Sequence, residues 1–247
     1  DKVLLARVGG EWAEPLDGYP STHILKPRSG RHLSLIFDEE YGSRFARGVG
    51  LATFETRIGM FDGHPALVVE RYDRDEAGER VHQEDFNQVL GHRGDEKYEP
   101  TTGDGRLRAI AASLREHAGS REVRKLVTMM TVSTALGNLD MHAKNISIIH
   151  APDGSVSLAP MYDVVPQLHL DVDPDVALQV NGKYEHREIS GADLVAEAES
   201  WRVRDAREIV GATLEQVHGI ARSEKPLPGA HPDLDRMIDR ITQRLIE

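Results

Sequence analysis

The chain has 247 residues, of which 39% are hydrophobic and 5% aromatic, and this length fits one large domain or two tight lobes. A formal net charge of −11 argues against extended contact with a nucleic-acid backbone, although it leaves open a local basic patch or an indirect route to DNA through a partner. The absence of cysteine excludes disulfides and thiolate metal sites, and no apolar segment approaches the roughly 18 to 20 residues of a membrane span, so we expect a cytoplasmic protein without membrane contact.

Residues 1 to about 75 have the pattern of strands joined by turns, with one helix among them. Apolar runs on either side of turn residues predict two hairpins and a single strand between them. The helix is expected over residues 38–49, because Tyr41, Phe45 and Val49 repeat at four-residue steps and so share one face. The predicted strands cover residues 3–8, 11–13, 22–26, 53–60 and 65–70.

From residue 76 onwards the hydrophobic period becomes helical. Apolar residues recur at i, i+3, i+4 and i+7 over residues 107–114 and again over 123–130, and a further amphipathic stripe covers 234–245. We therefore predict an α+β fold with two lobes like those of a protein kinase. A β-rich lobe would cover residues 1–75, and a mainly helical catalytic and substrate lobe would cover 76–247.

The residues from Gly137 to Asn145, together with Asp163, form the strongest functional pattern. Asp140 and Asn145 have the Asp-x-x-x-x-Asn spacing of a kinase catalytic loop, and Asp163 follows after a predicted hairpin over residues 146–158. Phosphoryl transfer needs a carboxylate to receive the hydroxyl proton and oxygen ligands to hold Mg²⁺ against the phosphates. Taken singly, Asn145 also fits a turn residue and Asp163 a helix N-cap.

A kinase also needs a strand lysine that reaches the ATP phosphates, a helix carboxylate that holds this lysine, and a hinge that receives adenine. Lys26 ends a predicted strand, and Glu39 and Glu40 lie on the next helix; of these two acids, we assign Glu40 to the cofactor site. The hinge is expected near residues 70–74, after the last strand of the first lobe. Lys26 by itself also fits an exposed charged residue at the end of a strand. Glu39 and Glu40 also fit the first turn of a helix, where negative charge interacts favourably with the helix dipole.

These segments resemble the HipA toxins, a family of bacterial serine/threonine kinases that belong to toxin–antitoxin pairs. The Gly-Asn-x-Asp-x-His-x-Lys-Asn string at 137–145 and the Tyr162-Asp163 pair carry most of the resemblance. It extends along nearly the whole chain. The other matching segments are residues 2–5, 22–26, 40–41, 69–74, 97–99, 158–163 and 177–184.

The resemblance implies a role for each matching residue of the catalytic region. Asp140 would be the catalytic base, and Asn145 and Asp163 would hold Mg²⁺. His142 would orient the loop, and Lys144 would neutralise charge near the γ-phosphate of ATP.

The same resemblance implies the nucleotide contacts of the first lobe. Lys26 would contact the ATP phosphates, Glu70 and Tyr72 would offer hinge backbone groups to adenine, and Asp73 would lie near the ribose. The expected cofactors are therefore ATP and Mg²⁺.

Family members phosphorylate a protein hydroxyl, in known cases on an aminoacyl-tRNA synthetase, and pair with a helix-turn-helix antitoxin that binds DNA. The resemblance thus implies a protein substrate, an antitoxin partner, and contact with DNA only through that antitoxin. It also implies a Gly-rich, Ser-containing phosphate loop and a small N-terminal subdomain before Asp1, whereas Gly9-Gly10 fits a hairpin turn. These parts could be omitted from the sequence, supplied by a separate protein or lost, and without the loop we expect weaker ATP binding.

Three other functions remain open at this stage. A small-molecule kinase of the aminoglycoside or choline type would share the catalytic roles and change only the acceptor. A catalytically inactive, kinase-like module would bind a partner instead, although the intact Asp140, Asn145 and Asp163 argue against it. A metal site unrelated to kinases, using Asp140 and His142, lacks a helix-spaced histidine pair to support it.

Overall fold

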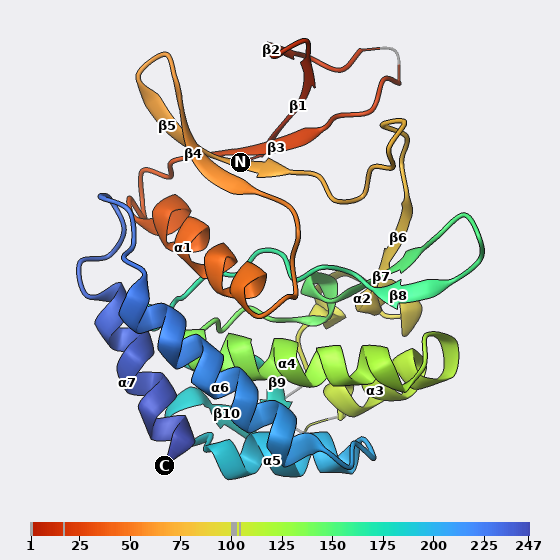
Figure 1. The fold of residues 1–247 in the computed structure, drawn as a ribbon, viewed down its shortest axis with the longest axis vertical. Coiled ribbons are helices and arrows are strands. Elements are labelled where there is room, and N and C mark those ends of the chain that lie inside the picture. Colours follow the sequence, from red (N-terminus) through yellow and green to blue (C-terminus); the bar gives the residue numbers. More distant parts are fainter. Residues whose placement is uncertain (1, 17, 100–102, 104) are drawn as a thin grey trace.

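The first part of the chain forms a curled antiparallel sheet with one helix against it (Figure 1). In the computed structural model, which describes residues 2–16, 18–99, 103 and 105–247, the strand order is β2-β1-β3-β5-β4. Lys26 lies on the central strand, where it pairs with Leu67 of the neighbouring strand. The strands are β1 (Val3–Val8), β2 (Glu11–Ala13), β3 (His23–Pro27), β4 (Thr56–Phe61) and β5 (His64–Glu70).

Helix α1 (Leu35–Gly48) lies between the sheet and the helices of the second part of the chain (Figure 1). Its Ile36 and Phe37 pack with Leu67 of β5 in a small apolar cluster. Its Tyr41 and Phe45 are fully buried and belong to the main core instead. The helix is therefore the element that joins the sheet to the larger core.

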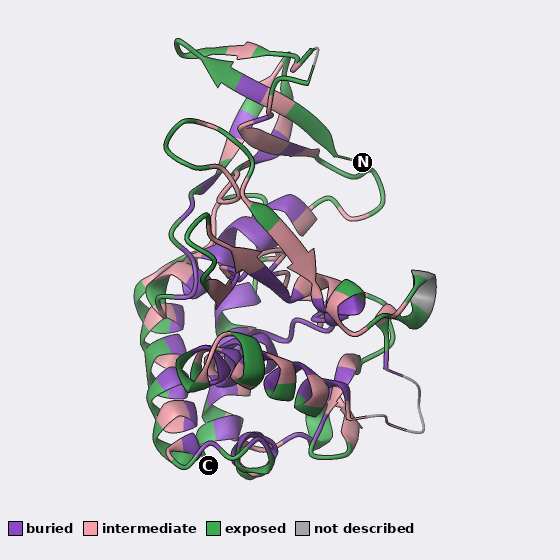
Figure 2. Ribbon diagram, turned by 90° about the vertical axis from the view of Figure 1, so that its right-hand side faces the viewer, coloured by how far each residue is buried: buried purple, intermediate pink, exposed green. Residues whose placement is uncertain are grey.

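The second part of the chain is mainly helical, with α4 at its centre in contact with α3, α5, α6 and α7. Figure 2 shows that the buried residues of these helices face inward and that the exposed ones face outward. The longer helices are α3 (Arg106–His117), α4 (Ser120–Leu136), α5 (Gly191–Ser200), α6 (Ala206–Ser223) and α7 (Leu234–Ile246). The short ones are α2 (Phe86–Val89), η1 (Gly94–Lys97), η2 (Ala143–Asn145) and η3 (His186–Glu188).

Two small antiparallel sheets complete the second part of the chain, as far as the structure describes it. One has the order β6-β7-β8, from β6 (His82–Asp85), β7 (Ser147–His150) and β8 (Val156–Leu158). The other is the hairpin of β9 (Asp175–Val180) and β10 (Lys183–Glu185). The first of these sheets matters for the site, because β6 follows the last segment of the large sheet and β7 follows η2 directly.

The predicted α+β, two-lobed kinase-like fold is confirmed, with small differences at the ends of its elements. Helix α1 begins at Leu35, three residues before the predicted start, and Pro27 is the last residue of β3. Strand β6 and the β9–β10 hairpin were not predicted. None of the described helices combines the length and the apolar character that a membrane crossing requires.

Candidate active site

A pocket lies between the large sheet and the segment that follows β8. Its walls include Ile24 and Val69 from the sheet and Phe54, Tyr72 and Met161 from the loops around it. Such an apolar slot suits a flat aromatic base. The same pocket is lined by a set of polar and charged side chains: Lys2, Lys26, Glu39, Glu70, Arg71, Asp73, Gln83 and Asp163.

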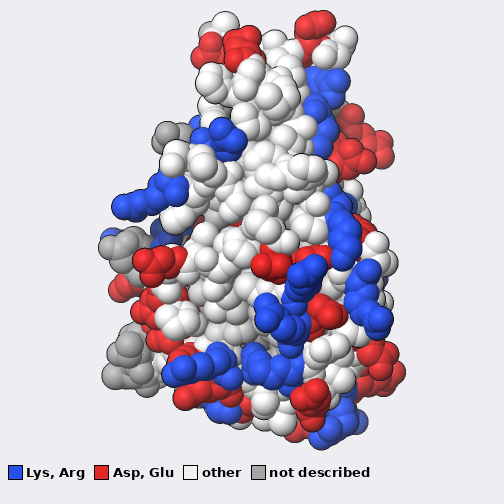
Figure 3. Space-filling view, turned by 90° about the vertical axis from the view of Figure 1, so that its left-hand side faces the viewer, with Lys and Arg blue, Asp and Glu red and all other residues white. Residues whose placement is uncertain are grey.

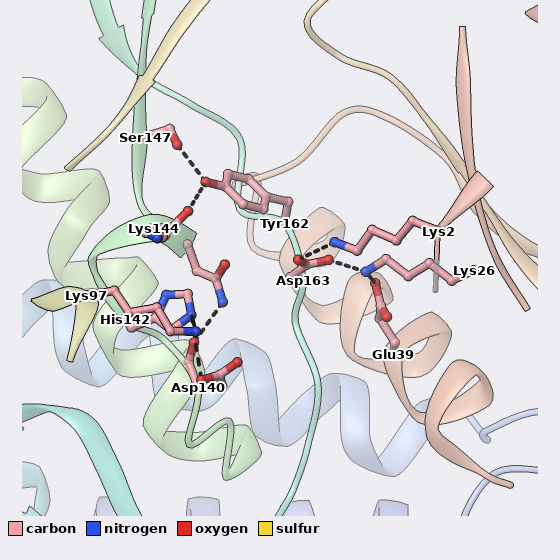
Figure 4. A network of polar contacts seen from close by, with 11 residues as sticks. Lys2, Lys26, Glu39, Lys97, Asp140, His142, Lys144, Ser147, Tyr162 and Asp163 are labelled. Carbon is pink, nitrogen blue, oxygen red and sulfur yellow. Dashed lines mark hydrogen bonds and ion pairs between the residues drawn. The ribbon is translucent and has the colours of Figure 1, made fainter. Parts of the chain in front are cut away.

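Lys26 is held in this pocket between two carboxylates (Figure 4). Its Nζ donates to Glu39 Oε1 at 2.5 Å and to Asp163 Oδ1, and Lys2 Nζ reaches Asp163 Oδ2 at 3.3 Å. Burial lowers the pKa of Lys26, but the charges of Glu39 and Asp163 outweigh it, so the pKa is raised overall. Burial likewise raises the pKa of Asp163, but Lys26 and Lys2 bring it below its usual value. The lysine is thus charged and the aspartate ionised at neutral pH.

The helix carboxylate that pairs with Lys26 is Glu39, whereas Glu40, which the sequence analysis assigned to the cofactor site, pairs with a different cation. Arg44, one turn further along α1, donates from Nε and Nη2 to the two carboxylate oxygens of Glu40 at 2.9 and 2.8 Å. Successive helix residues point about 100° apart, so adjacent acids face different partners. Which of the two acids faces Lys26 depends on the rotation of α1 against the sheet, and no local sequence pattern reveals that rotation.

Asp163 and its neighbour Tyr162 connect the pocket to the loop after α4. The backbone of Asp163 has φ +53°, in the left-handed region that non-glycine residues seldom adopt. The Tyr162 hydroxyl donates to the backbone oxygen of Lys144 at 2.8 Å and lies 2.6 Å from Ser147 Oγ. These contacts fix the Asp163 segment against the residues on either side of Asn145 (Figure 4).

The loop that carries Asp140 begins where α4 ends. Gly137 closes that helix with φ +66°, a conformation that glycine adopts without steric cost. The backbone N–H of Asp140 then donates to Asn138 Oδ1 at 3.2 Å, and Asn145 Nδ2 donates to the backbone oxygen of Asp140 at 2.7 Å. Asp140 and Asn145 are therefore joined directly, through the backbone oxygen of Asp140. With its amide nitrogen engaged, Asn145 has its amide oxygen left to offer a metal.

Lys97 and Tyr98, to which the sequence analysis gave no role, contact this loop. Lys97 Nζ lies 2.9 Å from His142 Nε2, and the Tyr98 hydroxyl donates to Asp140 Oδ1 at 3.1 Å. Burial lowers the pKa of His142, so its ring is neutral at pH 7, although Asp140 acts in the opposite direction. The Asp140 side chain is 43% exposed and so remains open to an incoming group. The only sequence signal for Lys97 and Tyr98 was their place in a segment matching the family.

Glu99 holds this segment in position. Its carboxylate accepts hydrogen bonds from the backbone N–H of Gly105 at 2.7 Å and from the backbone N–H and the side-chain Nε2 of Gln179, both at 2.8 Å. A buried carboxylate with several such donors is well compensated for the loss of water. The two distant family-like segments, 97–99 and 177–184, thus meet at one hydrogen-bonded group.

The predicted hinge residues line the pocket. The Tyr72 ring stacks on Tyr162 and meets Phe54 at a tilt, with centroid separations of 5.9 and 5.3 Å. Asp73 accepts hydrogen bonds from Arg71 Nε at 2.9 Å and Nη2 at 2.5 Å, and these outweigh burial and lower the pKa of Asp73. To accept a hydrogen bond from a ribose hydroxyl, the Asp73 carboxylate would therefore have to bind the ribose and Arg71 together. Glu70 ends β5 at the rim of the same pocket.

The donor set suits a hard divalent cation. Asp163 supplies carboxylate oxygens and Asn145 an amide oxygen, and Mg²⁺ prefers oxygen ligands of this kind. Lys26 and Lys2 both pair with Asp163, so a metal would compete with these ammonium groups for its oxygens. The pocket contains five of the predicted site residues, which are Lys26, Glu70, Tyr72, Asp73 and Asp163. The adjoining loop carries the other predicted residues of the catalytic region, which are Asp140, His142, Lys144 and Asn145.

Residues 1–222 match the HipA-like C-terminal domain family. The chain belongs to this family. The serine/threonine-protein kinase toxin HipA of Shewanella oneidensis is 29% identical over 214 residues, which cover 79% of this HipA-like chain and 48% of that protein. Y4mE of Sinorhizobium fredii, also named for kinase activity, is 34% identical over 186 residues, which cover 72% of this chain and 44% of Y4mE. The chain spans less than half the length of these two relatives.

Solved structures support the HipA-like fold. The Shewanella oneidensis HipA in complex with HipB and operator DNA superposes with a TM-score of 0.78 at 23% identity, covering 99% of this chain and 62% of that one. The Helicobacter pylori proinflammatory kinase CtkA gives a TM-score of 0.61 at 14% identity, covering 92% and 88%. The kinase-like arrangement of sheet and helices is thus shared by proteins of very different sequence.

Proposed function

We propose that this chain is the kinase core of a HipA-like serine/threonine protein kinase, which transfers the γ-phosphate of ATP to a protein hydroxyl. The observation that carries the proposal is the ion-paired group of Lys26, Glu39 and Asp163, linked through Tyr162 to the loop of Asp140 and Asn145. A strand lysine held by a helix acid, a metal-binding aspartate and a catalytic loop are the parts that phosphoryl transfer requires.

Each side chain has a defined task in this proposal. The apolar walls around Tyr72 receive the adenine, and Lys26 binds the phosphates while Glu39 keeps its ammonium group in place. Asp140 accepts the proton of the attacking hydroxyl, because its exposed carboxylate is fixed by the loop. Mg²⁺, held by Asn145 and Asp163, would neutralise charge on the transferring phosphoryl group. His142 and Lys97 position the Asp140 loop, and Lys144 contributes positive charge beside it.

We further propose that the whole protein is the toxin of a toxin–antitoxin pair. The HipA relative whose structure superposes here was solved with HipB and operator DNA, which supports an antitoxin as partner. The family resemblance implies that this antitoxin is of the helix-turn-helix type. The net charge of −11 favours contact with DNA through the antitoxin rather than directly. The acceptor that the family resemblance supports is a protein such as an aminoacyl-tRNA synthetase.

The test compares this protein with its Asp140→Asn variant after incubation of each with cell extract and Mg·ATP. Phosphopeptides are identified by mass spectrometry, and we expect serine or threonine phosphorylation that the variant makes about 10² to 10⁴ times more slowly, the usual loss for a general base. Asn is nearly the same size as Asp, so the variant should fold, which circular dichroism verifies. Equal labelling by both proteins, or labelling of small alcohols in place of proteins, would contradict the proposal.

A further inference from the structure

Three metal-ligating side chains converge on the outer face of the β6–β7 pair, away from the site described above. His82 and His150 are directly opposite each other in the antiparallel register, with ring centroids 4.9 Å apart. Glu84 lies two residues along β6 and therefore on the same face as His82. One of its oxygens, Oε2, is 2.8 Å from His150 Nε2 and 3.9 Å from His82 Nε2. All three ligand atoms lie within 4.8 Å of one another.

We propose that His82, Glu84 and His150 bind a divalent transition-metal ion, for which Zn²⁺ is the best match. Two imidazole nitrogens and one carboxylate oxygen are a common set of three protein ligands for Zn²⁺, with water in the fourth position. Nitrogen ligands also disfavour Mg²⁺ and Ca²⁺, which select oxygen.

The distances suit such an ion. Two ligands of a tetrahedral zinc centre are about 3.3 Å apart, given metal–ligand distances of about 2.0 Å. The separations of 2.8 and 3.9 Å lie on either side of this value, so rotations of the side chains can bring the ligands into place. The side chains of His82, Glu84 and His150 are 68%, 37% and 33% exposed, which leaves room for these rotations and for a bound water.

The location gives the ion a structural effect. Strand β6 follows the hinge segment, and its Gln83 lines the nucleotide pocket from the opposite face. Strand β7 comes directly after η2, which ends at Asn145, and the two strands lie side by side (Figure 1). A metal ion that binds both strands would link β6, which follows the hinge, to β7, which follows the catalytic loop. The inference does not depend on the proposed kinase activity.

Calorimetric titration of the untagged protein with Zn²⁺, in the presence of excess Mg²⁺, tests the site. We expect uptake of one equivalent by the unmodified protein. Affinity should fall by at least about tenfold in His82→Ala and in His150→Ala, because even residues that only orient a metal ligand typically contribute this much. His64→Ala is the matched control, since His64 is also exposed on a strand of the described chain but has no second histidine opposite it in the register.

Two further measurements separate the site from adventitious binding. Co²⁺ should give the visible absorption of a tetrahedral centre with the unmodified protein and with His64→Ala, and lose it with His150→Ala. Zn²⁺ should raise the melting temperature of the unmodified protein and of His64→Ala but not that of His150→Ala, because an ion that binds the folded state stabilises it. The proposal is overturned if the unmodified protein takes up no Zn²⁺, or if the His82→Ala, His150→Ala double variant binds it with unchanged affinity.

Discussion

Lys26 is the residue at which the sheet, helix α1 and the Asp163 segment meet. Its side chain is only 14% exposed, and an ammonium group so far from water is costly unless carboxylates compensate it. Glu39 and Asp163 provide this compensation, which explains why the pKa of Lys26 is raised despite burial. Lys26 itself therefore stays charged, at the place where the proposed function requires a phosphate contact.

The adjacent acids Glu39 and Glu40 allow this contact to be tested with a matched pair of variants. Glu39→Gln removes the charge that holds Lys26, so Mg·ATP binding should weaken by about tenfold, the loss expected for one hydrogen bond to a charged group. Glu40→Gln removes only the ion pair with Arg44 and should leave the affinity nearly unchanged. Calorimetric titration of both variants measures the difference. Equal losses of affinity in the two variants would show that Glu39 has no special part in nucleotide binding.

The site could be predicted from the sequence where its residues lie close together in the chain. Asp140 and Asn145 are five residues apart, and that spacing indicated the loop that carries both. Tyr98 lies 42 residues before Asp140, and no local pattern reveals that its hydroxyl reaches that carboxylate. The contact between Lys26 and Glu39 rather than Glu40 is hidden for a similar reason, because it depends on how α1 is rotated against the sheet.

Helix α1 approaches the Asp163 segment at Gly42. A methyl group added to Gly42 would come within 2.1 Å of the backbone oxygen of Val164, the residue that follows Asp163. Glu39 and Gly42 are three residues apart and lie on the same side of the helix. The absence of a side chain at Gly42 thus permits the close packing that brings Glu39 and Asp163 to the same lysine.

Gly42→Ala should therefore destabilise the protein by about 1 to 3 kcal/mol, as overpacking of a rigid contact does, and should also weaken Mg·ATP binding. The clash is with backbone, which cannot rotate away as a side chain can. Gly219→Ala in α6 is the control, because its added methyl group would meet open space and should stabilise the helix by up to about 1 kcal/mol. Urea denaturation of both variants measures the two free energies of unfolding. A Gly42→Ala protein as stable as the unmodified one would show that α1 can move away from Val164 without cost.

Across the whole molecule, the elements that could be predicted are those with strong local patterns. The hairpins of the large sheet and the helices α3, α4 and α7 all show a clear period in the sequence. Strand β6 has the sequence His-Gln-Glu-Asp, without alternating apolar residues, and is a strand because it pairs with β7. On the face shown in Figure 3, positive and negative side chains lie interspersed over the helices. The distribution of charged residues therefore does not predict how these helices pack.

Buried titratable groups in the helical part make the stability of the whole molecule depend on pH. His186 is 2% exposed, and its ring Nε2 donates to the backbone oxygen of Thr134 at 2.7 Å. Burial lowers its pKa, and the charge of Arg244 acts in the same direction, against the effect of the Thr134 contact. Asp193 also has a lowered pKa, because hydrogen bonds from Lys183, Ser190 and Asn181 outweigh burial.

Both shifts make acid destabilising, but in different pH ranges. The unfolded chain protonates its histidine near pH 6.5 while the folded protein does not, so the contribution of His186 is lost as the pH falls below 6.5. The contribution of Asp193 to stability is intact above about pH 4 and is lost as the pH falls further, towards the folded-state pKa of Asp193.

We expect the free energy of unfolding, measured with urea, to fall by about 1 kcal/mol or more between pH 7 and 5. His186→Gln keeps a donor for Thr134 but cannot titrate, so its loss over this range should be smaller, whereas the exposed His64→Gln should behave as the unmodified protein does. An unchanged slope in His186→Gln would mean that other groups cause the loss of stability in mild acid.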